Sequence, residues 1–219
     1  MQMVMKRSFT AEILDGDNVP EEQAARVYRE ITAIHRLLGD TRCLIQALRR
    51  DPLPVRSVLD IGCGQGGVLE HVTKTLGVPG IGVDIVAPVP SRSLTSQPII
   101  RANAVRDPMP QADVAIATHL AHHLTDQELI QLIRNVGRSC RRFILLDLVR
   151  SPLPLALFRV FIAPFVSRIA ASDGQTSVRR AYTRAELTAA VTAALSGTKA
   201  TFHYSVAPFA IRQVVDISY

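Results

Sequence analysis

The sequence predicts an α/β fold built on a seven-stranded mixed sheet, parallel except for a C-terminal antiparallel hairpin. Two observations support this prediction. From residue 56 onward short apolar runs alternate with helix-compatible segments, and two β-prone runs follow each other closely at the end of the chain. Strands that alternate with helices are joined by right-handed crossovers and therefore pair in parallel. The 219 residues suffice for one such domain, so we expect a single domain over residues 1–219.

The first 50 residues predict a helical cap in front of the sheet. Pro20 precedes an acidic first turn, and apolar residues then recur at helical spacing up to Leu38. Gly39 and Asp40 break this pattern. A second helix is expected from Thr41 to Arg50, because prolines follow immediately.

The elements of the sheet follow in order. Buried parallel strands are predicted at Ser57–Ile61, Gly80–Ile85, Ile99–Ala102, Val114–Thr118 and Phe143–Leu148. Helices are predicted at Gly67–Leu76 and Asp126–Cys140. A Thr183…Glu186 capping box opens a last helix to about Leu195, and strands at Ala200–Ala207 and Ile211–Ile217 form the hairpin.

Residues 151–183 interrupt this regular order. Ser151–Ala171 is apolar over about the length of a membrane span, but two arginines and three prolines favour a buried or interfacial helical insertion. The pair Asp173-Gly174 is a turn signal, so we expect the segment that follows to be a loop.

Composition excludes several classes of protein. The net charge of +6 comes from scattered arginines, aromatic residues make up 5%, and tryptophan is absent, so no nucleic-acid surface is predicted. The three cysteines lack any CxxC spacing, which argues against a disulfide framework or a zinc site and fits a reducing cytoplasm. No export signal is visible at the amino terminus, and the carboxylates show no clustering of the kind a magnesium site requires, so no metal is expected.

A glycine-rich turn follows the first predicted strand and fits two patterns at once. Gly62, Gly64 and Gly67 match the G-x-G-x-x-G dinucleotide fingerprint, whereas Gly62, Gly64 and Gly66 match the G-x-G-x-G loop of methyltransferases. Asp60 favours the second pattern, because a carboxylate beside the loop neutralises an ammonium group but repels a pyrophosphate. Asp84 ends the next strand, where a carboxylate accepts hydrogen bonds from the ribose hydroxyls of either cofactor.

The stretches VLDIGCGQG, GVDI, RANAVRDPMP and DVAIATHLAHHL resemble the successive motifs of class I S-adenosylmethionine-dependent methyltransferases, which have a Rossmann-like sheet. The resemblance implies S-adenosyl-L-methionine as cofactor. One departure concerns Asn103, where many relatives have aspartate; its amide oxygen can still accept a hydrogen bond from adenine. The candidate cofactor-binding residues are Arg36, Asp60, Gly62, Cys63, Gly64, Gly66, Asp84, Ile85, Asn103, Ala104, Thr118 and His119. His35 and Arg36 are candidates to cover the cofactor, with Arg36 or Arg42 pairing with its carboxylate; the alternative is that these residues are solvated surface charges.

A weaker resemblance connects EILDGDNVPEEQ, LLDLVRSPL and SDGQTSVRRAYTRAEL to a bacterial subgroup whose genes often neighbour type III polyketide synthases and flavin oxidoreductases. It suggests a lipophilic phenolic, quinone-like or polyketide acceptor. The apolar segment 151–171 then acts as a lid over this acceptor, as a dimer interface or as a peripheral membrane contact. Either a monomer or a homodimer is compatible with the sequence.

Histidines cluster after the fourth predicted strand, at the edge where ligands bind such sheets. One of His119, His122 and His123 is a candidate general base for an acceptor hydroxyl; alternatively they cap a helix or pack under the cofactor. The candidates for the acceptor side are Asp147, Arg150, Arg179 and Tyr182, although a local ion pair explains the first two equally well.

Three functions remain in competition at this stage. The first is methyl transfer from S-adenosylmethionine to a hydrophobic small molecule, at oxygen in preference to carbon. The second is an NAD-dependent oxidoreductase that uses the overlapping glycine pattern. The third is a catalytically silent binding protein with a methyltransferase fold, since a fold does not guarantee an activity.

Overall fold

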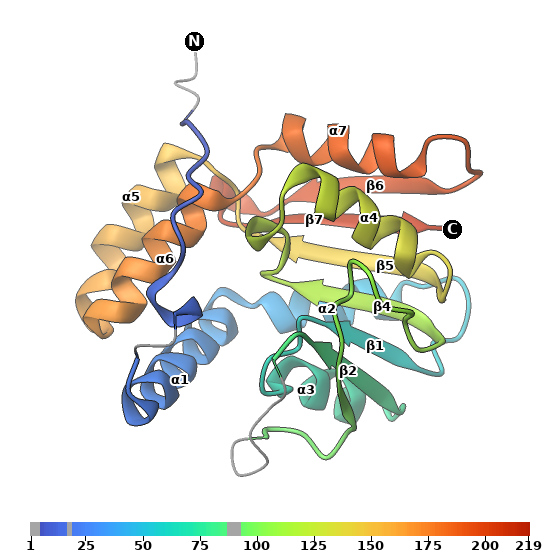
Figure 1. Cartoon of the computed structure of the whole chain (residues 1–219), viewed down its shortest axis with the longest axis horizontal. Coiled ribbons are helices and arrows are strands. Elements are labelled where there is room, and N and C mark those ends of the chain that lie inside the picture. Colours follow the sequence, from blue (N-terminus) through green and yellow to red (C-terminus); the bar gives the residue numbers. More distant parts are fainter. Residues whose placement is uncertain (1–4, 17–18, 87–92) are drawn as a thin grey trace.

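The computed structural model describes residues 5–16, 19–86 and 93–219, and its centre is one seven-stranded sheet (Figure 1). The strand order is β3-β2-β1-β4-β5-β7-β6. The strands are β1 (Val58–Ile61), β2 (Gly80–Asp84), β3 (Ile99–Arg101), β4 (Ala112–Thr118), β5 (Cys140–Asp147), β6 (Thr201–Val206) and β7 (Gln213–Ser218).

The first five strands pair in parallel, and β7 pairs antiparallel with both β5 and β6. The predicted mixed sheet with its antiparallel hairpin is therefore confirmed. The strand order reverses at β1, which lies between β2 and β4 with Asp60 level with Gly82 and Ile116. Sheets of this type bind their ligands beyond the carboxyl ends of the strands at such a reversal.

Helices cover both faces of the sheet. Helices α4 (Asp126–Val136) and α7 (Arg184–Leu195) pack on one face, in a core with Leu59, Ile61 and Phe143. Helices α2 (Asp40–Arg49) and α3 (Gly67–Leu76) pack on the other face, over Val58 and Ile116. Alternate residues of β1 thus enter different cores, as expected for a strand buried on both faces.

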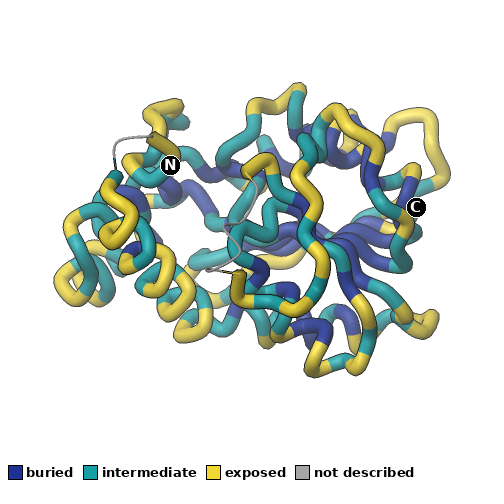
Figure 2. The backbone as a smooth tube through the Cα atoms, turned by 60° about the horizontal axis from the view of Figure 1, so that its bottom comes forward, coloured by how far each residue is buried: buried dark blue, intermediate teal, exposed yellow. Residues whose placement is uncertain are grey.

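A second group of helices lies beyond the carboxyl ends of the strands. Figure 1 shows α1 (Glu21–Leu38), α5 (Pro152–Phe161) and α6 (Arg168–Arg180) at the end of the sheet toward which β5 points. Helix α6 contacts both of the others. In Figure 2 the buried residues gather in the sheet, and the outer turns of these helices are largely exposed. The helical cap and the helical insertion therefore meet at the ligand-binding edge.

Short 3-10 helices complete the chain: η1 (Ile13–Asp15), η3 (Ala121–His123), η4 (Ala163–Phe165) and η5 (Pro208–Ala210). Helix α7 begins with the predicted capping box, in which Thr183 and Glu186 exchange hydrogen bonds. The predicted Asp126–Cys140 helix is too long, because α4 ends at Val136 and Cys140 already belongs to β5.

The loop predicted after Asp173-Gly174 is wrong, since both residues lie inside α6. Asp173 is buried, and its carboxylate accepts hydrogen bonds from the backbone N–H groups of Ile13 and Leu14. Gly174 gives room to the ring of Phe158, because a Cβ atom there would lie 2.2 Å from that ring. Tertiary contacts of α6 thus override a local turn preference.

All three cysteines are free thiols. Among the described residues, no helix combines the length and the apolar character that crossing a membrane requires.

Candidate active site

The glycine-rich turn between β1 and α3 has a backbone that only glycine adopts readily. Gly62, Gly64 and Gly66 all have positive φ angles, of 70°, 53° and 80°. A Cβ atom on Gly66 would lie 2.3 Å from the side chain of Thr95. The backbone N–H of Gly64 donates a 2.8 Å hydrogen bond to the Asp84 carboxylate, so the ends of β1 and β2 hold the turn together.

Asp60 lies directly below this turn and is 1% exposed. Within the described part of the chain, neither of its carboxylate oxygens has a hydrogen-bond partner. Burial, together with the nearby Asp84 carboxylate, raises the pKa of Asp60 to about 8. A buried carboxylate without a partner is costly, so its presence here points to a cationic ligand that approaches from the turn.

The remaining predicted cofactor residues line the same edge. Ile85 is exposed just after Asp84. The Asn103 side-chain oxygen accepts a 2.9 Å hydrogen bond from Val105 N–H and keeps a second lone pair. The Cys63 sulfur faces Gly82, where a Cβ atom would lie 2.6 Å from it. Ala104, Thr118 and the Gly62 turn are partly buried beside them, whereas Arg36 and Arg42 are exposed on α1 and α2.

His119 follows β4 and belongs to a buried cluster with Asp40. Its Nε2 lies 3.0 Å from Asp40 Oδ2, and the same oxygen lies 3.0 Å from His35 Nδ1. The two imidazole rings stack with centroids 3.8 Å apart. The Nδ1 atom of His119 is buried and has no hydrogen-bond partner among the described residues. His119 also has a positive φ of 54°, an uncommon backbone state for a non-glycine residue.

The charges in this cluster are well defined. Burial favours a protonated Asp40, but hydrogen bonds from His119 and His35 hold the pKa of Asp40 far below its ordinary range. Arg212 adds a 2.6 Å ion pair with the other Asp40 oxygen. Burial and the neighbouring His119 lower the pKa of His35 to about 4, so His35 is neutral near pH 7.

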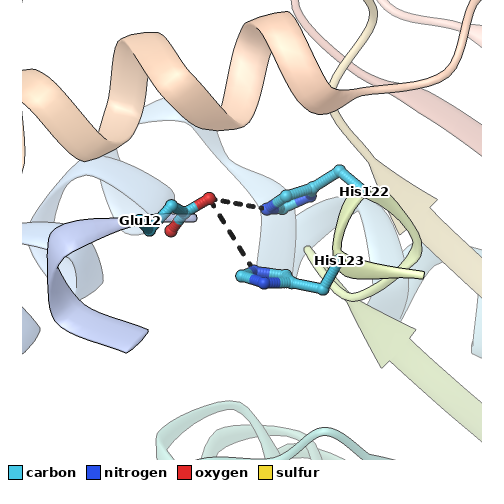
Figure 3. Close-up of side chains that lie close together, drawn as sticks. All are labelled: Glu12, His122 and His123. Carbon is cyan, nitrogen blue, oxygen red and sulfur yellow. Dashed lines mark ion pairs between the residues drawn. The ribbon is translucent and has the colours of Figure 1, made fainter. Parts of the chain in front are cut away.

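His122 and His123 form a separate cluster on η3 with Glu12, which reaches them from the amino-terminal segment (Figure 3). Glu12 Oε1 lies 3.5 Å from His122 Nε2 and 3.9 Å from His123 Nε2. His122 Nδ1 lies 2.7 Å from Asp147 Oδ1, at the end of β5. Burial lowers the basicity of His122, but the Asp147 and Glu12 carboxylates outweigh it and raise its pKa to about 9. The pKa of Asp147 is held at about 2, mainly by His122, despite its burial.

Two of the other residues predicted for the acceptor side, Arg150 and Tyr182, make their side-chain hydrogen bonds inside the protein. Arg150 is 4% exposed, donates to the carbonyl oxygens of Met5 and Ala181, and forms an ion pair with Glu186. Tyr182 is 1% exposed and donates to the Leu124 carbonyl oxygen. Arg179 is partly exposed at the end of α6, and its carbonyl oxygen accepts from Ser8 N–H.

Asp40 and Glu12 are not among the residues that the sequence predicts for the site. The pair Gly39-Asp40 predicts a break between two helices, whereas Asp40 is the first residue of α2. Glu12 lies 110 positions before His122, and nothing in the local pattern connects the two. The signal that the sequence offers for Asp40 is an acidic residue at the start of an otherwise basic helix.

Comparison with known proteins agrees with this geometry. Residues 23–156 match the protein family described as "Methyltransferase domain". A comparison with curated proteins found no match.

Solved structures share the fold. The plantazolicin methyltransferase BpumL, in complex with SAH, has a TM-score of 0.72 at 14% identity, covering 94% of this chain and 92% of its own. The plantazolicin methyltransferase BamL, in complex with a triazolic desmethylPZN analog and SAH, has a TM-score of 0.70 at 16% identity, covering 91% of both chains. A protein from Nostoc punctiforme PCC 73102, provisionally described as an O-methyltransferase, has a TM-score of 0.63 at 17% identity, covering 98% of this chain and 64% of its own.

The match to the family extends over more than half of the chain and includes the glycine-rich turn, Asp60, Asp84 and the histidine cluster after β4. The protein therefore belongs to the methyltransferase domain family and is a class I methyltransferase.

Proposed function

We propose that this protein transfers a methyl group from S-adenosyl-L-methionine to a hydroxyl group of a lipophilic small molecule of phenolic, quinone-like or polyketide type. The observation that carries the proposal is the buried Asp60 carboxylate, which has no hydrogen-bond partner among the described residues and lies under the glycine turn. The ammonium group of a methionine moiety satisfies such a carboxylate. In its ionised form this carboxylate would repel the pyrophosphate of NAD, which disfavours the oxidoreductase alternative.

The other residues at this edge would contact the ribose and the adenine of the cofactor. Asp84 holds Gly64 through one oxygen and keeps lone pairs for ribose hydroxyls. The exposed Ile85 side chain would cover one face of adenine, and the half-buried Asn103 and Ala104 would lie along its edge. When bound, S-adenosylmethionine supplies a methyl group activated by a positively charged sulfur.

We assign His119 as the general base that removes the proton from the acceptor hydroxyl group. If Nε2–H donates to Asp40, the lone pair of His119 remains on the buried Nδ1, which has no partner within the described chain. This nitrogen would accept the hydroxyl proton of the acceptor, whose oxygen takes the methyl group as the methyl–sulfur bond breaks and a neutral thioether leaves. The Asp40 carboxylate stabilises the resulting imidazolium, and the stacked His35, neutral near pH 7, adds no competing charge.

The lipophilic nature of the acceptor is supported by the helices at this edge. Their outer surface exposes large apolar side chains, namely Leu153, Val160 and Phe161 of α5 and Phe165 of η4. Exposed apolar surface of this kind favours contact with an apolar small molecule or with the membrane that holds it. BpumL and BamL bind desmethylPZN analogs, so this fold also accommodates larger natural products.

Binding of the cofactor product is the first test. Isothermal titration of the protein with S-adenosylhomocysteine is expected to give one site per chain, and NAD is expected to give none. Asp60→Asn should remove this binding. Asp113→Asn changes a carboxylate at the amino end of β4, away from the ligand-binding edge, and should leave the binding intact. Tight NAD binding without a response to S-adenosylhomocysteine would favour the oxidoreductase.

Turnover is the second test. The protein is incubated with isotope-labelled methyl donor and a panel of phenols, quinols and polyketide-like enols, and products are identified by mass spectrometry. We expect the label on oxygen of at least one apolar member. Tight binding of S-adenosylhomocysteine with no transfer to any acceptor would instead favour the catalytically silent binding protein.

A further inference from the structure

We propose that Glu12, His122 and His123 form a binding site for a divalent transition-metal ion of the zinc type, distinct from the cofactor and acceptor sites. The sequence predicts no metal, because the cysteines lack CxxC spacing and the carboxylates are not clustered, and Glu12 lies far from the histidines in the chain. In the folded protein one oxygen and two ring nitrogens, one from each residue, lie within 4.8 Å of one another (Figure 3).

The distances suit three ligands of one ion. Glu12 Oε1 lies 3.5 Å from His122 Nε2 and 3.9 Å from His123 Nε2. Two ligands of a tetrahedral zinc ion, each at about 2.1 Å from the metal, are separated by about 3.4 Å. Both distances from Glu12 exceed this value by no more than a few tenths of an ångström, and the two ring nitrogens lie within 4.8 Å of each other. Two imidazoles and one carboxylate also form one of the ligand sets that hold zinc in enzymes.

Both imidazoles are oriented as metal-binding histidines are. His122 Nδ1 lies 2.7 Å from Asp147, and His123 Nδ1 lies 3.4 Å from Asp15. A carboxylate at Nδ1 fixes the proton there and directs the lone pair of Nε2 outward. Both Nε2 atoms face Glu12. The Glu12 carboxylate is itself held by a 2.7 Å hydrogen bond from the Ser177 hydroxyl.

The charge of the surroundings favours a dication. Glu12, Asp15 and Asp147 contribute three carboxylates, and Arg180 at 3.4 Å from Asp15 contributes one positive charge. An incoming ion displaces the proton from Nε2 of His122, and once both imidazoles are neutral two negative charges remain for the ion to neutralise. His122 and Asp147 are buried, whereas the His123 side chain is 30% exposed. The exposed side of His123 is where an ion and a water ligand would approach from solvent.

The other histidine cluster does not share these properties, although His35, Asp40 and His119 also lie close together. Both rings there share a single oxygen of Asp40, and Arg212 already neutralises that carboxylate. With neutral imidazoles its net charge is zero. A dication therefore has an electrostatic reason to choose Glu12, His122 and His123.

An ion at this site would connect three parts of the chain. Glu12 precedes η1, the histidines form η3 at the end of β4, and Ser177 belongs to α6. Binding would fasten residues 12–15 across the carboxyl edge of the sheet. Metal occupancy would thereby control how firmly the amino-terminal segment covers this edge.

Zinc titration with a competing chromophoric chelator tests the site without any activity measurement. The metal-free protein should bind one equivalent of Zn²⁺ per chain. Glu12→Gln and His123→Gln should each weaken binding by at least 100-fold, and Asp15→Asn by about 10- to 100-fold. Circular dichroism shows whether each variant is folded. Glu12→Gln retains an acceptor for Ser177, so it is the variant expected to perturb the fold least.

Two matched variants serve as controls that should keep Zn²⁺ binding. His71→Gln removes an exposed histidine on α3, and His35→Gln removes a ligand of the competing cluster; both should bind Zn²⁺ as the parent protein does. Cobalt substitution adds a spectroscopic signature, with visible absorption that Glu12→Gln should abolish. Binding that is lost in His35→Gln but kept in Glu12→Gln, or binding no tighter than that of surface histidines, overturns the proposal.

Discussion

His119 Nε2 lies 3.0 Å from the buried carboxylate of Asp40, although the two residues are 79 positions apart and come from different layers of the fold. The contact joins the end of β4 to the first residue of α2. It leaves Nδ1 as the ring nitrogen of His119 that has no hydrogen-bond partner among the described residues. Its chemical importance is directly measurable.

Replacing His119 by asparagine should lower kcat for hydroxyl acceptors by about 10²- to 10⁴-fold, the usual contribution of a general base. Asparagine tolerates the positive φ at this position, so the backbone should be preserved. Binding of S-adenosylhomocysteine should change little. Steady-state kinetics and calorimetry measure the two effects separately, and an unchanged kcat would show that His119 accepts no proton. His71→Gln serves as control.

Replacing Asp60 by asparagine should flatten the pH dependence of stability in the absence of cofactor. The folded pKa of Asp60 is about 8, against 3.8 in an unperturbed carboxyl group. Between these values the folded state holds a proton that the unfolded state lacks, so stability falls as pH rises from about 4 to 8. The unfolding free energy of the variant should not show this fall. The difference in unfolding free energy between variant and parent should therefore shift in favour of the variant by roughly a few kcal/mol from pH 4 to pH 8. Urea denaturation at several pH values measures it; parallel curves would contradict the assignment.

The same carboxylate should couple cofactor binding to proton release. Below pH 8 the free protein carries a protonated Asp60, and the ammonium group of the cofactor favours the ionised form. Affinity for S-adenosylhomocysteine should therefore increase with pH up to about 8, by at most tenfold per pH unit. Calorimetry in buffers of different ionisation enthalpy counts the released proton. An affinity that falls over this range would exclude the coupling.

Gly66→Ala and Gly197→Ala form a matched pair. Both glycines have a φ of 80°, so alanine costs about 1–2 kcal/mol at either position. At Gly197 the added methyl group meets no atom within 4 Å, but at Gly66 it would lie 2.3 Å from Thr95. Gly66→Ala should therefore lose more stability and also weaken cofactor binding, while Gly197→Ala affects stability alone. Equal effects on binding would show that the turn does not contact the cofactor.

Gly174→Ala should separate α5 from α6. The added Cβ would lie 2.2 Å from the Phe158 ring, so the helices must move apart or the ring must turn. Overpacking of this kind costs about 1–3 kcal/mol. A second substitution, Phe158→Leu, should recover part of the loss, and thermal unfolding of the single and double variants measures this. Additive losses would mean that the two side chains do not meet.

The sequence predicts most of the sheet because its signals are local. Each buried strand is a short apolar run, and the glycines beside Asp60 lie within a few residues of it. The same locality explains the failure at Asp173-Gly174. There the decisive contacts come from Ile13, Leu14 and Phe158, which are distant in sequence.

The candidate site was only partly predictable for the same reason. The histidines after β4 could be recognised from their position at a strand end. Their partners Asp40 and Glu12 could not, because each reaches its histidine only after the helical cap and the amino-terminal segment have packed. The same order of helices and strands is compatible with many ways of packing these segments. Contacts between residues in different layers therefore leave no recognisable pattern in a single sequence.

The amino-terminal segment also constrains the order in which the protein can be completed during synthesis. Ser8 bonds to Arg179, the Arg7 guanidinium donates to Arg180, and Glu12 bonds to Ser177. A ribosome produces this segment before α6, yet its docking surface exists only after residues 168–180 have also been made. The nascent chain therefore carries an open ligand-binding edge until α6 has emerged, and residues 7–12 reach their final positions long after they have been translated.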